Sequence, residues 1–335
     1  MGIHLLLDDG RNHWPPAIWP EHLAYARELV GDWGYVTQLV RLDDLDSDKW
    51  QLFMDLCADL HLTPILRLAT TYDQTAGWWL APPPDDNNSS YTHVARQYAQ
   101  FVAALRWPTT AHYVIVGNEP NHGDEWGERP FPAQYARFLL DTSVALKTAD
   151  PHARVLNAPL DLYTPHSGSQ PFNNGLWYMD AAAFLDDMIA AYPNIFTYLD
   201  AWASHLYPAS FTAPPWQQTF QFDRLHDAVA LPLTQPPPAV WNRGINGYEW
   251  ELWWLSQHHI TPLPIFITET GWRHQEAAQS SLDTGSYPDA ALVQTYLDLA
   301  WWGNGNGRYP TYPSSGWTPW MTDTRVVAVT PFALN

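Results

Sequence analysis

Short apolar runs alternate with longer amphipathic segments along this chain, and this alternation restricts its fold more than any other feature. A short apolar run followed by a helical pattern is typical of a βα unit, and repeated βα units build a parallel sheet. The apolar runs are Ile3–Leu7, Tyr35–Arg41, Pro64–Leu68, Tyr113–Gly117, Arg154–Ala158, Ala201–His205, Pro264–Thr268 and Val326–Thr330. Eight runs of this kind predict an α/β fold in which one domain, residues 1–335, forms a (β/α)8 TIM barrel.

Helical patterns separate these runs. They cover Glu21–Val30, Asp48–Leu60, Tyr91–Leu105, Ala133–Thr148, Met179–Ala191, Tyr248–His258 and Asp289–Trp302, with a further possible helix at Phe220–Val229. Pro20 and Pro132 suit the first turn of a helix, and Ser47 is the expected N-cap of the second one. No helical pattern follows the eighth run, so we expect the last helix of the barrel to be missing from this chain. The long loops all follow strands, where barrels place their active sites.

The charge balance excludes several classes of partner. The net charge is −19, from 35 acidic and 16 basic residues, whereas a nucleic-acid-binding protein would carry a basic stripe. Acidity also disfavours anionic membrane surfaces, and no apolar run is long enough to span a membrane. Cys57 is the only cysteine and lies in a helical pattern, so neither a disulfide framework nor a cysteine metal cluster is expected.

The start of the chain has no visible signal peptide, because Met1-Gly2 runs straight into the short apolar segment Ile3–Leu7. A trimmed mature form and an intracellular protein both fit this start. We favour a secreted or cell-surface location over a cytoplasmic one, and we expect a monomer without a cofactor.

The aromatic content is high, with 20 Trp, 17 Tyr and 12 Phe. Several tryptophans fall in predicted loops: Trp78, Trp79, Trp126, Trp177, Trp216, Trp317 and Trp320. Loop aromatics expose apolar surface unless something covers them, and the C–H faces of sugar rings stack well on aromatic rings. The group therefore favours a carbohydrate substrate, with Trp79, Trp126 and Trp272 as candidate sugar-binding residues.

Two of the apolar runs end in a glutamate. The fourth run leads into Asn118-Glu119-Pro120, and the seventh leads into Glu269. Strands four and seven can face each other across a barrel mouth, so the two carboxyl groups can flank one bond. Glycoside hydrolysis requires such a pair, in which one group protonates the leaving oxygen and the other attacks the anomeric carbon or activates water.

The sixth run ends in His205 and Tyr207, whose spacing of two residues places both side chains on one face of the strand. Tyr207 could donate a hydrogen bond to Glu269, and His205 could contact the sugar or the acid/base. Arg41 ends the second run, and Arg67 lies within the third one. Because a buried arginine needs a carboxylate partner, one of them is expected to keep the pKa of the nucleophile low. The sequence does not decide which one.

Taken together, these residues resemble the clan of retaining β-glycosidases with (β/α)8 barrels, known as clan A or the 4/7 superfamily. The matching elements, in chain order, are Arg41, Asn118-Glu119-Pro120, His205-x-Tyr207 and Glu269. The resemblance implies that Glu119 is the acid/base, that Glu269 is the nucleophile and that Asn118 binds the sugar 2-hydroxyl group. Many members carry a tryptophan at the end of strand eight, where this chain has Phe332; Trp317 or Trp320 could also reach in from the preceding loop.

Two other functions fit parts of the pattern. A non-catalytic carbohydrate-binding barrel would keep the aromatic cleft, although the presence of both glutamates disfavours it. A metal-dependent barrel hydrolase would begin with His-x-His, but His4 lacks a second histidine in place. The run His122, Asp124 and Glu125 is expected to face solvent or line a sugar subsite, and no metal is expected.

Overall fold

Parallel strands occupy the centre of the computed structural model, which describes residues 1–85, 90–217, 228–234, 243–275, 287–305, 307–313 and 317–334. One sheet has the strand order β1 (Gly2–Leu5), β2 (Gly34–Arg41), β3 (Leu62–Ala69), β6 (His112–Val116) and β7 (Ala153–Asn157). The other has the order β10 (Val326–Val329), β9 (Ile265–Thr270) and β8 (Trp202–Leu206). A short antiparallel pair, β4 (Tyr72–Asp73) and β5 (Trp78–Trp79), lies in the loop after β3. All eight predicted runs form parallel strands, with ends shifted by a few residues.

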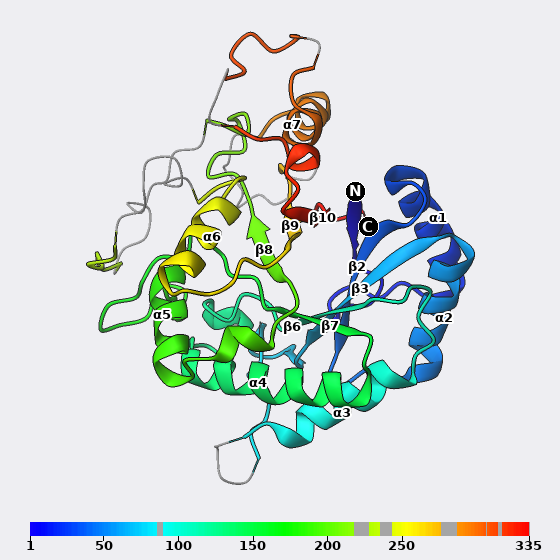
Figure 1. Ribbon diagram of the computed structural model, residues 1–335, viewed down its shortest axis with the longest axis vertical. Coiled ribbons are helices and arrows are strands. Elements are labelled where there is room, and N and C mark those ends of the chain that lie inside the picture. The colour runs from blue at the N-terminus through cyan, green and yellow to red at the C-terminus, as the bar shows by residue number, and fades with distance from the viewer. Residues whose placement is uncertain are drawn as a thin grey trace.

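Helices surround the strands on the outside of the molecule (Figure 1). They are α1 (Trp19–Val30), α2 (Ser47–Asp59), α3 (Thr92–Ala104), α4 (Pro132–Ala149), α5 (Ala181–Ala191), α6 (Tyr248–Gln257) and α7 (Ala290–Trp302). Short 3-10 helices lie at η1 (Pro16–Ile18), η2 (Gly123–Glu125), η3 (Ile195–Tyr198) and η6 (Trp320–Thr322). None of the helices in the described ranges is long and apolar enough to cross a membrane.

The N-cap of the second helix differs from the predicted one. Ser47 is the first residue of α2 and not its N-cap; the Asp46 carboxylate accepts hydrogen bonds from the backbone N–H groups of Asp48 and Lys49 instead. Aspartate and serine are equivalent N-cap residues, so their order in the sequence could not decide between them. The possible helix Phe220–Val229 lies almost entirely outside the described residues. Its last residue donates a backbone hydrogen bond to His166.

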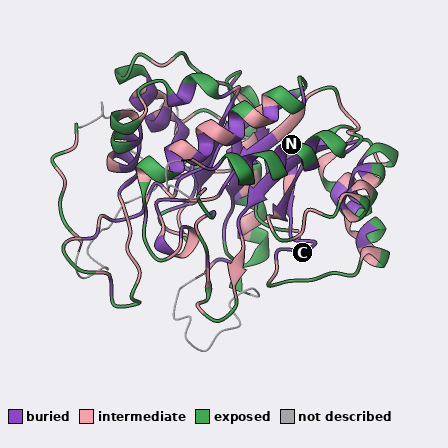
Figure 2. Ribbon diagram, turned by 90° about the horizontal axis from the view of Figure 1, so that it is seen from below, coloured by how far each residue is buried: buried purple, intermediate pink, exposed green. Residues whose placement is uncertain are grey.

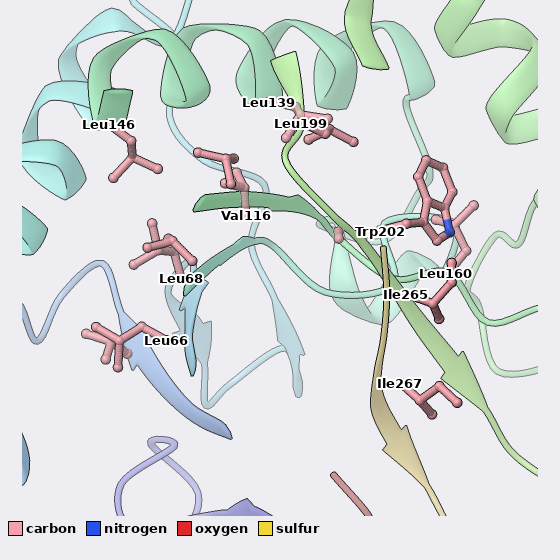
Figure 3. Packing of buried hydrophobic residues seen from close by; sticks show 14 of the residues in the cluster. Leu66, Leu68, Val116, Leu139, Leu146, Leu160, Leu199, Trp202, Ile265 and Ile267 are labelled. Carbon is pink, nitrogen blue, oxygen red and sulfur yellow. The ribbon is translucent and has the colours of Figure 1, made fainter. Parts of the chain in front are cut away.

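The buried side chains form two layers, one on each face of the strands, and Figure 2 shows the strands buried beneath partly exposed helices. Leu66, Leu68 and Val116 belong to the outer layer, as do Leu139 and Leu146 on α4 (Figure 3). The inner layer contains Ile65, Ile115, Leu156, Ala203, Phe266 and Ala328 from six different strands. Because strand side chains alternate between faces, Arg67 follows Ile65 on the inner face, and His205 follows Ala203.

Hydrogen bonds connect the two sheets in two places. Between β7 and β8, Leu156 and Ala201 form a parallel bridge, and the Asn157 side chain exchanges hydrogen bonds with the backbone of Ala203. Between β1 and β10, the backbone of His4 bonds with Pro331 and Leu334. The result is an α/β architecture with central parallel sheets, and it resembles a TIM barrel.

Candidate active site

Glu119 lies in a tight turn after β6. Gly117 has φ +95°, a conformation that side chains disfavour, and Glu119 itself has φ +31°. The turn is fixed by its hydrogen bonds: the backbone N–H of Glu119 donates to the Pro159 carbonyl at 3.0 Å, and its carbonyl accepts from His122 at 2.8 Å. A residue held in a sparsely populated conformation needs such a surrounding and is often found at functional sites. The turn therefore holds the carboxyl group of Glu119 in one place.

The side chain of Glu269 lies on the inner face because the register between β8 and β9 shifts by one residue. In the pairing of β8 with β9, Ser204 lies opposite Ile267 but His205 lies opposite Glu269, so Thr268 is an extra residue. Ile265 and Ile267 are packed in the outer layer, and strict alternation would have sent Glu269 outward with them. The extra residue forms a bulge, which re-aims the side chain that follows it. Glu269 consequently joins the inner face beside His205.

The carboxylate of Glu269 is held from several sides. One oxygen accepts a hydrogen bond from the Arg67 guanidinium, and the other accepts from the Tyr207 hydroxyl at 3.0 Å. Burial would by itself raise the pKa of Glu269, but the electrostatic effects of His205 and Arg67 outweigh it and lower that pKa to about 2. Burial and the nearby carboxylates raise the pKa of Tyr207, so its hydroxyl group stays protonated and remains a donor. Glu269 is therefore ionised at neutral pH.

His205 lies between the two glutamates. Its Nδ1 is 2.7 Å from Oε1 of Glu119, and its Nε2 is 3.7 Å from Oε1 of Glu269. The ring is almost fully buried on the inner face. His205 thus lies beside both carboxyl groups, one after β6 and one in β9.

Asn118 connects the two sides of the site. Its side-chain oxygen accepts a hydrogen bond of 2.8 Å from the same Arg67 nitrogen that contacts Glu269. A chain of polar contacts thereby runs from Glu269 through Arg67 to Asn118.

The structure distinguishes the two arginines. Arg41 contacts Asp8 at 3.2 Å and Asp43 at 3.0 Å at the rim, and only Arg67 touches Glu269. The pairing of β2 with β3 explains the difference, because Arg67 is opposite Leu39. Arg41 consequently lies two residues closer to the rim than Arg67. The candidate Arg41 is therefore displaced from the two glutamates.

Phe332 and His4 pack together beside Glu269, and of the two only Phe332 was predicted as a site residue. Phe332 follows β10, is 41% exposed, and its ring lies 4.9 Å from that of His4. Nε2 of His4 is 3.7 Å from Glu269. Burial lowers the pKa of His4 to about 3, so the ring is neutral. The sequence suggested His4 only as part of a metal motif, although its place in the first apolar run was a signal for an inward position.

The candidate tryptophans are largely covered by protein. Trp126 is 2% exposed and packs edge-on against Tyr135 of α4. Trp272 is 5% exposed, and its indole N–H donates to the Ala213 carbonyl. Trp79 is 4% exposed and packs with Leu39. Loop position therefore misled the subsite prediction for these three rings, because each is buried by packing. Trp320 is also buried in the core, at 1% exposure.

The predicted loop run after Glu119 is more enclosed than expected. Nε2 of His122 lies 2.8 Å from the Asp161 carboxylate and 2.6 Å from the Thr164 hydroxyl. Burial opposes a charge on His122, but Asp124 and Asp161 outweigh it and raise its pKa well above the usual value. The ring ties the loop after β6 to the loop after β7. Among the described residues, no group of three or more His, Cys, Asp and Glu side chains is arranged to hold a metal ion.

Comparison with known proteins gives similarity at the level of fold. No protein-family model and no curated protein sequence matches the chain. Among solved structures, it is similar to a glucosidase from Croceicoccus marinus, with a TM-score of 0.50 and 9% identity over 84% of this chain and 53% of that one. It also matches fungal β-1,4-galactanases, with a TM-score of 0.45 and 14% identity over 83% of this chain and 76% of that one.

A third match is an exo-β-1,4-mannosidase from an Opitutaceae bacterium, with a TM-score of 0.44, 17% identity, and coverage of 77% of this chain and 42% of that one. The chain spans about half the length of the glucosidase. These structural neighbours are glycoside hydrolases, as the clan resemblance of the sequence implies. At such low identity, the likeness of the glucosidase concerns the fold alone.

Proposed function

We propose that this chain is a retaining glycoside hydrolase that cleaves β-linked oligosaccharides or polysaccharides. The observation that carries the proposal is the shared position of Glu119 and Glu269 on either side of His205. Glu269 is ionised and buried beside Arg67, as a nucleophile must be. A neutral sugar substrate also suits a chain with a net charge of −19.

The proposed reaction has two displacement steps. First, Glu269 attacks the anomeric carbon while the bond to the leaving oxygen breaks and Glu119 transfers its proton to that oxygen. Glu119 then takes a proton from water, and the water oxygen displaces the Glu269 carboxylate from the anomeric carbon. Two inversions leave the anomeric configuration unchanged. Asn118 would bind the sugar 2-hydroxyl group, and Phe332 would stack on the reacting sugar.

The spacing of the two carboxyl groups distinguishes retaining from inverting enzymes. Retaining enzymes place them about 5–5.5 Å apart, whereas inverting enzymes need about 6.5–9.5 Å to admit water. Glu119 and Glu269 both lie beside one imidazole ring, at 2.7 Å and 3.7 Å from its two nitrogens. Retention is expected here because Asn118-Glu119-Pro120 and Glu269 resemble the residues of the retaining clan.

We also propose that the two sheets together form one closed (β/α)8 barrel. The support comes from the bonds of Asn157 with Ala203 at one edge and of His4 with Pro331 and Leu334 at the other. Closure would bring the ends of β6 and β9 to opposite sides of the same mouth, as a pair of carboxyl groups requires.

Replacement of the proposed nucleophile, Glu269, tests the function. Glu269→Ala should lower kcat on an aryl β-glycoside by more than about a thousandfold, as removal of a catalytic group does. Added azide should then restore turnover and yield the α-glycosyl azide. In Glu119→Ala, azide should yield the β-glycosyl azide, because the enzyme ester still forms. Product anomers are identified by NMR.

Glu128→Gln is the matched control, since Glu128 lies in the same loop as Glu119 but is exposed. It should leave turnover unchanged. If Glu269→Ala keeps full activity, or if the wild type releases a product of inverted configuration, the assignment is wrong. If the wild type binds glycans but turns over none of a panel of aryl β-glycosides, the chain is the non-catalytic carbohydrate-binding barrel.

A further inference from the structure

Asn121 is a fully buried amide that closely follows the proposed acid/base in the chain, and neither displacement step uses it. Its side-chain nitrogen donates to the backbone carbonyl groups of Asp161 and Met179, at 2.9 Å and 3.2 Å. Its side-chain oxygen accepts from the backbone N–H of Asp161 at 3.3 Å. Both polar atoms of the Asn121 side chain are therefore bound to the backbone of the loop after β7.

Asp161, the partner of Asn121, is also paired with the histidine that contacts Glu119. Its backbone forms a parallel bridge with His205 of β8, and Nδ1 of His205 lies 2.7 Å from Oε1 of Glu119. The backbone carbonyl of Glu119 accepts from the His122 N–H at 2.8 Å, which closes a turn that contains Asn121. A closed circuit of contacts thus runs from the Glu119 turn through Asn121 and Asp161 to the imidazole ring and back to the Glu119 carboxyl group.

We propose that Asn121 is a positioning residue that holds the Glu119 carboxyl group against His205. It does so by fixing the turn after β6 to the backbone of Asp161. The turn needs such support, because Glu119 has φ +31°, a sparsely populated conformation. The ring of His122 touches the Asp161 carboxylate, whereas Asn121 binds the backbone of that residue, which is the part that pairs with β8. The inference rests on the proposed function for the role of Glu119, but the contacts of Asn121 do not depend on it.

The position of Glu119 matters most for substrates with a poor leaving group. A strongly basic departing oxygen, as in an alkyl glycoside, needs the proton of the acid, whereas a stable phenolate can leave without it. A shift of about 1 Å in a reacting group can cost about a hundredfold in rate. Loss of Asn121 should therefore act selectively, whereas a smaller fraction of folded enzyme would lower the rates on all substrates equally.

Asn121→Ala tests this selectivity in kcat/KM, which reports the first displacement. On an alkyl β-glycoside the variant should lose about tenfold to a hundredfold, and on a dinitrophenyl β-glycoside it should stay within about threefold of the wild type. Asn121→Ser keeps a hydroxyl donor and should show the same selectivity with a smaller loss. It carries the test if thermal unfolding shows that the alanine variant does not fold.

Ser167→Ala is the matched control. Oγ of Ser167 accepts from the Tyr178 N–H at 2.9 Å, so its removal breaks a hydrogen bond inside the loop after β7 and leaves the Asn121 contacts in place. Both rates should stay within about twofold of the wild type. Equal losses of Asn121→Ala on the two substrates, in an enzyme whose wild type is active, would overturn the proposal.

A second measurement does not require turnover. In protein labelled with ¹⁵N-histidine, the Nδ1 resonance of His205, assigned by its loss in His205→Gln, reports the contact with Glu119. It should shift in Asn121→Ala toward its position in Glu119→Ala, and it should stay in place in Ser167→Ala. An unchanged His205 resonance in Asn121→Ala would contradict the positioning role. A wild type that is inactive on all glycosides would refute the glycosidase function but leave this test intact.

Discussion

Arg67 and Arg41 lie on neighbouring strands, and Arg41 is two residues closer to the rim of the sheet. This difference in position gives the two side chains different roles. Both follow inner-face positions on neighbouring strands, and each has an acidic partner. Arg67 contacts the buried Glu269, whereas Arg41 contacts Asp8 and Asp43 at the rim. A buried charge interacts far more strongly than one near water. Only Arg67 is therefore expected to control the ionisation of the nucleophile.

Replacing Arg67 by leucine should raise the pKa of Glu269. The charge of Arg67 helps to lower that pKa to about 2, and an arginine beside a carboxylate typically accounts for about 1–3 units. The acidic limb of kcat/KM, where Glu269 becomes protonated, should consequently move to higher pH by about 1–2 units. Arg41→Leu is the control and should leave this limb in place. Equal shifts in both variants would mean that long-range charge and not the contact sets the pKa.

Several site residues could be predicted from sequence, and the others depend on three-dimensional packing. Glu119 and Glu269 were identifiable because each ends an apolar run. The position of His4 beside Glu269 was not, since it depends on how distant strands are arranged around the site. The tryptophans illustrate the opposite error: Trp126 is in a loop by sequence, yet a neighbouring helix buries it. Sequence position alone does not say which loop side chains face inward.

At the scale of elements, the strand order and most helices follow from periodicity, but the bulge in β9 does not. Ile265-Phe266-Ile267-Thr268-Glu269 reads as regular alternation, and this pattern would place Glu269 on the same face as Ile267. The extra residue at Thr268 reverses that placement. Bulges arise from pairing between strands distant in the sequence, so a single strand carries no indication of one.

The contact between α6 and β8 contains a buried carboxyl group that should make stability depend on pH. Glu251 is 1% exposed and accepts a hydrogen bond from the Trp202 indole at 2.9 Å. Burial raises the pKa of Glu251 from 4.5 to about 8. A carboxyl group with a raised pKa in the folded state binds its proton more tightly there than in the unfolded chain. Its stabilising contribution is complete below pH 4.5 and is lost as pH rises through 8.

Glu251→Gln should therefore weaken the fall of stability between pH 5 and pH 7.5. The slope of the free energy of unfolding should differ from the wild type by up to about 1.4 kcal/mol per pH unit. Glu249→Gln is the control on the same helix, because Glu249 is partly exposed and paired with Arg325 at the surface. Urea unfolding at several pH values measures the difference. Parallel pH profiles for the wild type and Glu251→Gln would show that Glu251 titrates normally.

For the whole molecule, the main question is whether the two sheets behave as one cooperative unit. Their backbone pairing on the β7–β8 side includes two isolated bridges, Leu156 with Ala201 and Asp161 with His205, and Asn157 supplements it. The buried Asn157 amide donates to the Ala203 carbonyl at 3.0 Å and accepts from the Ala203 N–H at 2.9 Å. A side chain here takes the place of a ladder of backbone hydrogen bonds, and a closed barrel would depend on it.

Asn157→Leu should consequently destabilise both sheets together. Leucine has a similar size but leaves the Ala203 N–H and carbonyl groups buried without a partner, at about 1–3 kcal/mol for each group. Asn174→Ala, which removes an exposed hydrogen bond to Tyr178, should change stability by less than about 0.5 kcal/mol. Hydrogen exchange should show β1–β7 and β8–β10 losing protection to the same extent in Asn157→Leu. If only β8, β9 and β10 lose protection, the sheets are separate units, and the closed barrel that would hold Glu119 opposite Glu269 is not the cooperative structure of this chain.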